Sequence, residues 1–443
     1  MAIGKALRAK VSRRSHAGWK TPKSGRDPIR LLVESSRGRE PSLIPIRYGR
    51  MLQSPFTFYR GAAAIMAADL ARTPTSGIRV QACGDCHLLN FGAFATPERR
   101  VIFDINDFDE TLPAPFEWDV KRLAASFVVA SRANGYKSSD AHDAAQVCAE
   151  VYRQRMAEYA TMKVLDVWYG RIDLETLMGI LSAAERRRTL RRRLEKAKAR
   201  DVAEEDFPKL AELHGREAKI KDNPPLIYHF AEAATAEFER RIAKAFELYR
   251  RTLAEDRRFL LDRYELKDVA MKVVGVGSVG TVSAILLLMA ADDDPLFLQV
   301  KEARTSVLEP YAGKSAFASR GERVVVGQRL MQSASDLFLG WTETDVGRHF
   351  YVRQLRDMKL KPLVELWDTS QMIEYAGFCG WALARAHARS GDAAAISGYL
   401  GGRGAFDEAV ADFAVDYADQ NERDHKALVA AVKAGRMEVH LER

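Results

Sequence analysis

The chain has 443 residues, more than one hydrophobic core usually supports, so two lobes are expected. Its 47% hydrophobic and 29% charged residues are ordinary for a globular protein, and its apolar runs are too short to cross a bilayer. Four cysteines exclude a disulfide framework, and the N-terminus lacks the apolar stretch of a secretory signal. A cytoplasmic protein without a membrane span is therefore predicted.

The formal charge of +8 is concentrated in two stretches, residues 1–26 and residues 185–200. The second stretch, ERRRTLRRRLEKAKAR, is expected to be an exposed helix. Such a surface can attract nucleic acid, anionic lipid or a phosphorylated substrate. We favour a solvated helix face, because no aromatic residues interleave for base stacking. Nucleic acid is therefore the less favoured partner.

The first half of the chain is predicted to be mainly helical. Residues 1–28 are expected to form a basic, flexible tail. A Ser followed by Pro and helical apolar spacing predicts a helix over 54–72. Short strands are expected at 78–82 and 99–110, and residues 117–264 have the composition of helices.

The second half begins with a strand-rich block. Two apolar, β-branched runs flank ADDDP, which is turn chemistry, so a hairpin is expected over residues 281–303, preceded by another strand and a glycine loop. A helix is predicted over 314–335 and a strand pair over 336–355. From residue 369 to the C-terminus the chain returns to helical patterns.

The stretch CGDCHLLNF, residues 83–91, has the C-x-x-C-H spacing of haem attachment or of a redox pair. The predicted cytoplasmic location argues against haem. A four-cysteine zinc site would need a second close pair, which the sequence lacks. The alternative is that Asp85, between the two cysteines, is the important residue.

An acidic cluster follows this stretch in sequence. Asp85 and Asn90 lie after one predicted strand, and Asp107 and Asp109 lie at the end of the next. Hard oxygen ligands of this kind suit Mg²⁺, with Asp109 assisting, and an Asp at such an edge can take a proton from a hydroxyl. The structural alternative is that these residues form Asx-turns and cap the following helix.

These residues carry a family resemblance. GDCHLLN (84–90), INDFDE (105–110) and FEWDVKRLA (116–124) resemble the signature of aminoglycoside-phosphotransferase-like kinases. The surrounding RYGRMLQSPFTFYRGAA (47–63) and LARAHARSGD (383–392) resemble the bacterial family known as domain of unknown function 2252.

The resemblance implies roles for particular residues: Asp85 as catalytic base, Asn90 and Asp107 as metal ligands, and Asp119 as a structural acid behind them. His87 of the signature is retained and is expected to brace the loop. Cys83 departs from the pattern, because it stands where the phosphotransferases have His before Gly-Asp.

A glycine-rich pattern is the candidate phosphate-binding element. GVGSVGTV (275–282) fits G-x-G-x-x-G-x-V, which is compatible with a Rossmann site, a kinase glycine loop or a plain tight hairpin. A strand pair ending in FLQVKEA follows, which favours the kinase loop with Lys301 on the next strand. Glu322 is expected to pair with Lys301. The predicted nucleotide-binding residues are Gly275, Gly277, Ser278, Gly280, Lys301 and Glu322.

The order of the motifs is reversed relative to ordinary kinases, because the glycine loop follows Asp85 instead of preceding it. We therefore expect an α+β, protein-kinase-like, two-lobed fold that is circularly permuted. Four segments are predicted: the tail 1–28, a helical lobe 29–265 with the catalytic and metal loops, a small β-rich nucleotide-binding lobe 266–362, and the rest of the helical lobe, 363–443.

The function expected is ATP- and Mg²⁺-dependent phosphoryl transfer to a hydroxyl of an acceptor whose identity the sequence does not reveal. Transfer of AMP is the closest alternative. A catalytically silent, nucleotide-sensing or nucleic-acid-binding protein is the alternative from another class. A redox or haem role ranks last.

Overall fold

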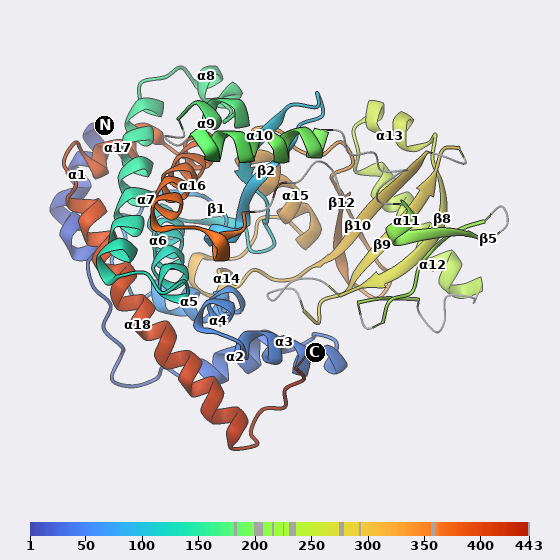
Figure 1. The fold of residues 1–443 in the computed structure, drawn as a ribbon, viewed down its shortest axis with the longest axis horizontal. Helices are drawn as coiled ribbons and strands as arrows, with labels where there is room; N and C mark the ends of the chain where they lie inside the picture. Colours follow the sequence, from blue (N-terminus) through green and yellow to red (C-terminus); the bar gives the residue numbers. More distant parts are fainter. Residues whose placement is uncertain are drawn as a thin grey trace.

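The computed structural model describes residues 1–180, 184–198, 207–214, 217–224, 226–229, 236–273, 279–291, 294–355, 360 and 362–441. Figure 1 shows a large helical part on one side and a β-sheet with a few helices on the other. The mixed α+β class and the division into a larger helical and a smaller sheet part are confirmed. No helix among the described residues is long and apolar enough to span a bilayer.

Four long helices form the core of the helical part. They are α6 (Phe116–Ala133), α7 (Ser138–Tyr159), α16 (Thr369–Ser390) and α18 (Ala405–Lys433). Helix α6 is buried almost from end to end, and α7, α16 and α18 pack around it. Helix α16 starts with a capping box between Asp368 and Gln371, as Asp at an N-cap favours. Both ends of the chain therefore contribute to one core.

Shorter helices surround these four. They are α2 (Pro28–Ser36), α3 (Ile44–Leu52), α4 (Pro55–Gly61), α5 (Ala63–Leu70), α8 (Val164–Tyr169), α9 (Leu174–Ile180), α10 (Ala184–Lys198) and α17 (Ala393–Leu400). Ser54 caps α4 with the predicted geometry, followed by Pro55. The helix expected over 54–72 is nevertheless two helices, because the backbone of Ala62 leaves the helical conformation.

Residues 1–28 are not a flexible tail in this structure. Helix α1 (Ala2–Lys10) packs on α17, and the 3₁₀ helix η1 (Arg13–His16) packs on α18. His16 and Trp19 are buried, and His16 Nε2 lies 2.6 Å from the Tyr399 hydroxyl. The prediction rested on basic composition, and it missed the aromatic and imidazole groups that this segment buries against the C-terminal helices.

Two short two-stranded antiparallel sheets lie in the helical part, next to its acidic loops. In the first, β1 (Arg79–Ala82) pairs with β4 (Leu112–Pro115). In the second, β2 (Phe91–Ala95) pairs with β3 (Val101–Ile105). The predicted strands at 78–82 and 99–110 are therefore present.

The sheet of the smaller part has the strand order β11-β12-β10-β9-β8-β7 and is antiparallel throughout. Its strands are β7 (Ile227–Tyr228), β8 (Glu265–Lys272), β9 (Ser283–Met289), β10 (Pro295–Ala303), β11 (Gly340–Glu343) and β12 (His349–Gln354). The hairpin expected over 281–303 is formed by β9 and β10. Helices α14 (Glu309–Ala312) and α15 (Arg320–Met331) follow β10, so the helix predicted over 314–335 is shorter than expected.

Residues before 266 also contribute to the smaller part. Helices α12 (Ala236–Arg251) and α13 (Glu255–Leu261) cover one face of the sheet, where Tyr249 and Leu261 join the apolar cluster of the strands. The hairpin of β5 (Ala211–His214) and β6 (Glu217–Ile220), preceded by α11 (Phe207–Leu210), packs on the other face. The predicted lobe boundary at 266 is thus too late, because helical periodicity does not reveal which surface a helix covers.

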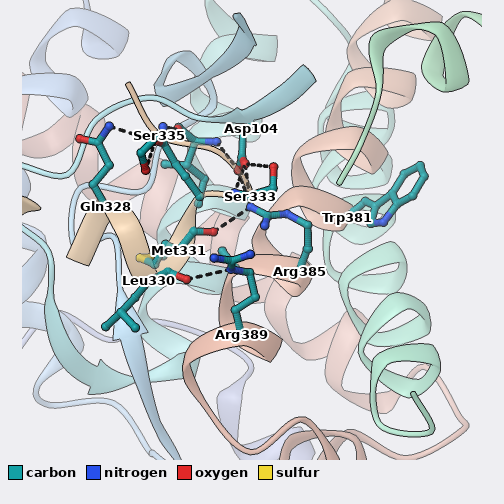
Figure 2. A network of polar contacts seen from close by, with 12 residues as sticks. Asp104, Gln328, Leu330, Met331, Ser333, Ser335, Trp381, Arg385 and Arg389 are labelled. Atoms are coloured by element: carbon teal, nitrogen blue, oxygen red, sulfur yellow. Dashed lines mark hydrogen bonds and ion pairs between the residues drawn. The ribbon is translucent and has the colours of Figure 1, made fainter. Parts of the chain in front are cut away.

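A buried ion pair connects the core of the helical part with α15 (Figure 2). The Arg385 guanidinium on α16 contacts both carboxylate oxygens of Asp104 on β3 at 2.6 and 2.8 Å, and neither side chain is exposed. Arg385 also donates to the Met331 carbonyl at the end of α15, and the Ser333 amide and hydroxyl donate to Asp104. These contacts fix α15 relative to the hairpin that carries the acidic loop.

Candidate active site

The loop that follows β1 turns sharply and is held from behind by α6. Gly84 has a φ of +85°, and a Cβ there would lie 2.5 Å from the Glu110 carbonyl oxygen, so only glycine fits. The Asp119 carboxylate on α6 accepts hydrogen bonds from the amides of Cys83 at 2.6 Å and Gly84 at 3.0 Å. His387 on α16 contacts the same carboxylate at 3.2 Å. Asp119 therefore supports the loop from the side of α6.

Asp85 presents one free carboxylate oxygen. The buried Arg122 guanidinium, on α6, donates to Asp85 Oδ1 through Nε at 2.9 Å and through Nη2. Oδ2 accepts no hydrogen bond from any described residue, and the Asp85 side chain keeps 22% of its surface exposed. Arg122 thus fixes the orientation of the carboxylate and leaves Oδ2 available to a ligand.

Asn90 and Asp107 also present free oxygen atoms. Asn90 Nδ2 donates to the Asp85 carbonyl at 2.6 Å, so its Oδ1 points away and meets no donor from the described residues. Asp107 Oδ1 accepts from the Asp109 amide at 3.2 Å, whereas Oδ2 accepts nothing from the described part of the chain. Burial and the neighbouring Asp109 raise the pKa of Asp107, although Lys301 and Arg353 act to lower it.

Asp109 is used differently. Its Oδ2 accepts from the Lys301 ammonium at 2.7 Å and its Oδ1 from the Tyr351 hydroxyl at 2.5 Å. Burial acts to raise the pKa of Asp109, but Lys301 and Tyr351 outweigh burial and the pKa is lowered. Asp109 therefore positions Lys301, which lies 3.9 Å from Asp107 Oδ1. The predicted assistance of Asp109 to a metal is not what this geometry favours.

The other nucleotide-binding candidates divide into three groups. Gly275, Gly277 and Ser278 lie outside the described residues. Gly280, the last glycine of the glycine-rich segment, has a φ of +84°, and its carbonyl accepts a hydrogen bond from the Glu40 amide at 2.7 Å. Glu322 lies in the first turn of α15 and forms no ion pair with Lys301 in the described structure, because Asp107 and Asp109 surround the ammonium instead.

Cys83 and Cys86 are buried and free. The Cys83 thiol donates to the Asp107 carbonyl at 3.3 Å, so it links the loop of Asp85 to the acidic loop. Burial raises the pKa of the Cys86 thiol well above its usual value, which disfavours the reactive thiolate. The C-x-x-C-H spacing therefore serves the packing of this loop.

The side chains of Asp85, Asn90 and Asp107 meet in a cleft of about 280 Å³. Asp85, His87, Asn90, Asp107, Asp109 and Glu110 line its acidic side. Arginines line another part of it, namely Arg39, Arg47, Arg60 and Arg304. Thr281, two residues before β9, also reaches the cleft, which places the end of the glycine-rich segment beside the acidic loops.

A family model described as "Uncharacterized protein conserved in bacteria (DUF2252)" matches residues 39–431. The chain belongs to this family. The predicted membership is thus confirmed, and the matched range includes every residue named above as lining the cleft. Comparison with the curated proteins and with the solved structures gave no match.

The free oxygen atoms are suitable for Mg²⁺. Among the described residues no three His, Cys, Asp or Glu side chains converge as a complete metal-binding group. Mg²⁺ does not need one, since it is commonly held by one or two carboxylates together with substrate phosphates and water. Asp107 Oδ2 and Asn90 Oδ1 would supply the protein's share of such a site.

Sequence reasoning missed three side chains that organise the cleft. Arg122 orients Asp85, Tyr351 orients Asp109, and His387 supports Asp119. Arg122 could have been found, because it lies one helical turn after Asp119 on a predicted helix and faces the same side. Tyr351 and His387 are more than 200 residues away from their partners, and no local pattern marks them.

His87 makes the stability of the fold sensitive to acid. The imidazole is buried, its Nδ1 has no partner among the described residues, and burial lowers its pKa from 6.5 to about 3. Between these two values the unfolded chain binds a proton that the folded chain does not, so stability falls as the pH falls from 6.5 towards 3. The slope is at most about 1.4 kcal/mol per pH unit for one group.

We expect His87→Asn to flatten this slope when the free energy of unfolding is measured by urea denaturation from pH 7 to about pH 4. Part of the slope remains, because burial also lowers the pKa of His16 to about 3. His440→Asn, at an exposed position, is the matched control and leaves the slope unchanged. An equal slope in wild type and His87→Asn would contradict the assignment.

Proposed function

We propose that this protein is an ATP- and Mg²⁺-dependent phosphotransferase that acts on a hydroxyl group. The proposal rests on three oxygen atoms in one cleft that accept no hydrogen bond from the described residues: Asp85 Oδ2, Asn90 Oδ1 and Asp107 Oδ2. Each has its side chain fixed by a hydrogen bond at another atom. Such preorganised acceptors suit a proton acceptor and a metal site placed side by side.

Lys301 supports the nucleotide part of the proposal. It is buried on β10, in the middle of the sheet, and its register partners are Ser283 on β9 and Tyr351 on β12. A lysine on the strand after a glycine loop is the phosphate-binding arrangement of kinases. The 3.9 Å separation from Asp107 would let Lys301 hold phosphate oxygens next to the metal ligands.

The proposed reaction is a simple displacement. When bound, Mg²⁺ and the nucleotide supply charge stabilisation and the phosphoryl group. Asp85 Oδ2 would accept the proton of the acceptor hydroxyl as the acceptor oxygen bonds to the γ-phosphorus and the bond to the β–γ bridging oxygen breaks. Arg122 would keep the Asp85 carboxylate aligned during this step, and Lys301 would position the phosphates.

Contacts between the two ends of the helical part support a permuted, kinase-like arrangement. The end of α16 lies beside β1: Ser390 Oγ accepts from the Gln81 amide at 3.2 Å, and Gly391 packs directly against Val80. A chain that ran from α16 straight into β1 would place the glycine loop before Asp85, which is the ordinary kinase order. Cutting there and joining the other ends yields the order of this sequence.

The metal assignment predicts that Asp107→Ala loses the effect of Mg²⁺ on nucleotide binding. We expect Mg²⁺ to tighten ATP binding to the wild type, measured by calorimetry, and expect the variant to lose at least roughly 10- to 100-fold in apparent Mg²⁺ affinity. Asp143→Ala on α7 removes an exposed carboxylate far from the cleft and serves as the control. Mg²⁺ enhancement that persists in Asp107→Ala would exclude this ligand.

Product analysis separates the alternatives. Transfer of phosphate adds a phosphoryl group to the acceptor and releases ADP, whereas AMP transfer adds a nucleotidyl group and releases pyrophosphate. Mass spectrometry of products from cell extract incubated with ATP would distinguish the two. Steep salt dependence of RNA or DNA binding without ATP turnover would favour the nucleic-acid alternative.

A further inference from the structure

Four arginines form a basic wall in the cleft: Arg39, Arg47, Arg60 and Arg304. They come from the segment around α2 to α4 and from the end of β10. No carboxylate of the described residues forms an ion pair with any of the four. Guanidinium groups that line a cleft without an ion-paired carboxylate can bind an anionic ligand.

Three of these guanidiniums are fixed by neutral acceptors. Arg39 donates to the Val279 carbonyl at 2.6 Å, which ties it to the end of the glycine-rich segment. Arg47 donates to Ser36 Oγ at 2.8 Å and to the Gly61 carbonyl at 2.9 Å. Arg304 donates to the carbonyls of two residues of the same segment, Ser35 and Arg37. Carbonyl and hydroxyl groups orient these charges without neutralising them.

Arg60 is the exception, because it donates no hydrogen bond to any described residue. It lies in the last turn of α4, and its Nε is buried without a partner. Burial lowers the pKa of Arg60, while Asp85 is the carboxylate that acts most strongly to raise it. Arg60 therefore lines the cleft near the proposed catalytic base with its donors unused.

The acidic residues near this wall have partners of their own. Glu34 pairs with Arg30 at 3.0 Å, and Glu302 accepts from the Val282 amide at 3.0 Å. Glu110 accepts from the Val307 amide at 2.7 Å. None of these three forms an ion pair with Arg60. Asp85 is already held by Arg122, and Glu365 acts on Arg60 more weakly than Asp85 does and forms no ion pair with it in the described structure.

We propose that the acceptor is itself a phosphorylated hydroxy compound, whose existing phosphate binds Arg60 while its hydroxyl meets Asp85 Oδ2. This inference rests on the proposed phosphotransferase function and names the substrate class. Four guanidiniums that form no ion pair with a described carboxylate suit a dianionic phosphate better than a single carboxylate. Cationic acceptors such as amino sugars would be repelled by the same wall.

Inorganic phosphate is the probe for this site. We expect calorimetry to detect its binding to the full chain in the presence of Mg²⁺ and a non-hydrolysable ATP analogue, which fills the nucleotide's own phosphate positions. Arg60→Gln should weaken phosphate binding roughly 10- to 100-fold, as loss of a charged hydrogen-bonding group does. Arg60→Lys should retain part of the affinity, and the affinity for the ATP analogue should be unchanged in both variants.

Arg72→Gln is the matched control, because Arg72 is an exposed arginine just beyond α5, and it should bind phosphate like the wild type. Melting curves of all variants establish that they fold. Phosphate binding that is absent from the wild type, or unaltered in Arg60→Gln, would overturn the proposal. A loss of ATP-analogue affinity in Arg60→Gln with phosphate binding intact would also overturn it, since Arg60 would then serve the nucleotide.

The same titration without nucleotide separates this proposal from the proposed function. If the protein fails to bind ATP but binds phosphate in an Arg60-dependent way, the phosphotransferase assignment fails and the anion site stands. If it binds ATP with Mg²⁺ but phosphate binding does not depend on Arg60, the acceptor class is wrong and the phosphotransferase assignment stands.

Discussion

Asp85→Asn is expected to abolish turnover with little loss of nucleotide binding. The amide cannot accept the proton of the acceptor hydroxyl, and removal of a general base typically costs about 10²- to 10⁴-fold in rate. Nucleotide binding should survive, because Lys301, Asp109 and Tyr351 form a separate group of contacts. Turnover and the dissociation constant of an ATP analogue are the two measurements.

The same substitution also affects stability. Arg122 is buried, and Asp85 is its carboxylate partner, so the variant leaves a buried guanidinium without an opposite charge. Removing one partner of such a pair costs about 3–5 kcal/mol when the pair is fully buried, and less here because Asp85 is partly exposed. Activity must therefore be normalised to folded protein, measured at a temperature below the onset of unfolding.

Asp407→Asn is the matched control for this effect. Asp407 on α18 is buried and accepts a hydrogen bond from Arg153 Nε on α7 at 2.8 Å. Neither residue lines the cleft. The control should lose stability and keep its turnover. Activity of Asp85→Asn close to that of the wild type would show that Asp85 is not the base.

The acidic loops were predictable because the signals are local. Asp85 follows β1, and Asn90 and Asp107 flank the two strands of the β2–β3 hairpin, so short sequence spacing places them close together. Gly84 and Ser54 likewise occupy positions where backbone geometry restricts the residue type. Predictions of this kind depend on interactions within about one hairpin or one helical turn.

The partners of these residues were not predictable, because they come from distant segments. Lys301 meets Asp109 across 192 residues, and its register on β10, not its sequence neighbourhood, decides that it faces Asp109 instead of Glu322. The N-terminal segment was misjudged for the same reason: His16 and Trp19 are buried, and they make contacts with Tyr399 and Asp416 near the other end of the chain. The composition of a segment indicates its overall polarity, but it does not indicate which distant segment packs against it.

Arg385→Leu is expected to be the most destabilising of the substitutions considered. It leaves Asp104 charged in a fully buried position, which costs about 3–5 kcal/mol in the free energy of unfolding. Urea denaturation followed by circular dichroism measures this loss. Arg132→Leu is the control, because the ion pairs of Arg132 with Asp419 and Glu422 are partly exposed and such pairs contribute about 1 kcal/mol or less.

A second variant tests whether the loss comes from the buried charge. The double variant Arg385→Leu/Asp104→Asn lacks the isolated carboxylate, so it should be more stable than Arg385→Leu alone. If Arg385→Leu were no less stable than Arg132→Leu, the pair would not stabilise the fold. The same network holds Met331 and Ser333 at the end of α15, and β3, which carries Asp104, leads directly into the loop of Asp107 and Asp109. Loss of the network should therefore also lower the ATP affinity of the molecules that remain folded.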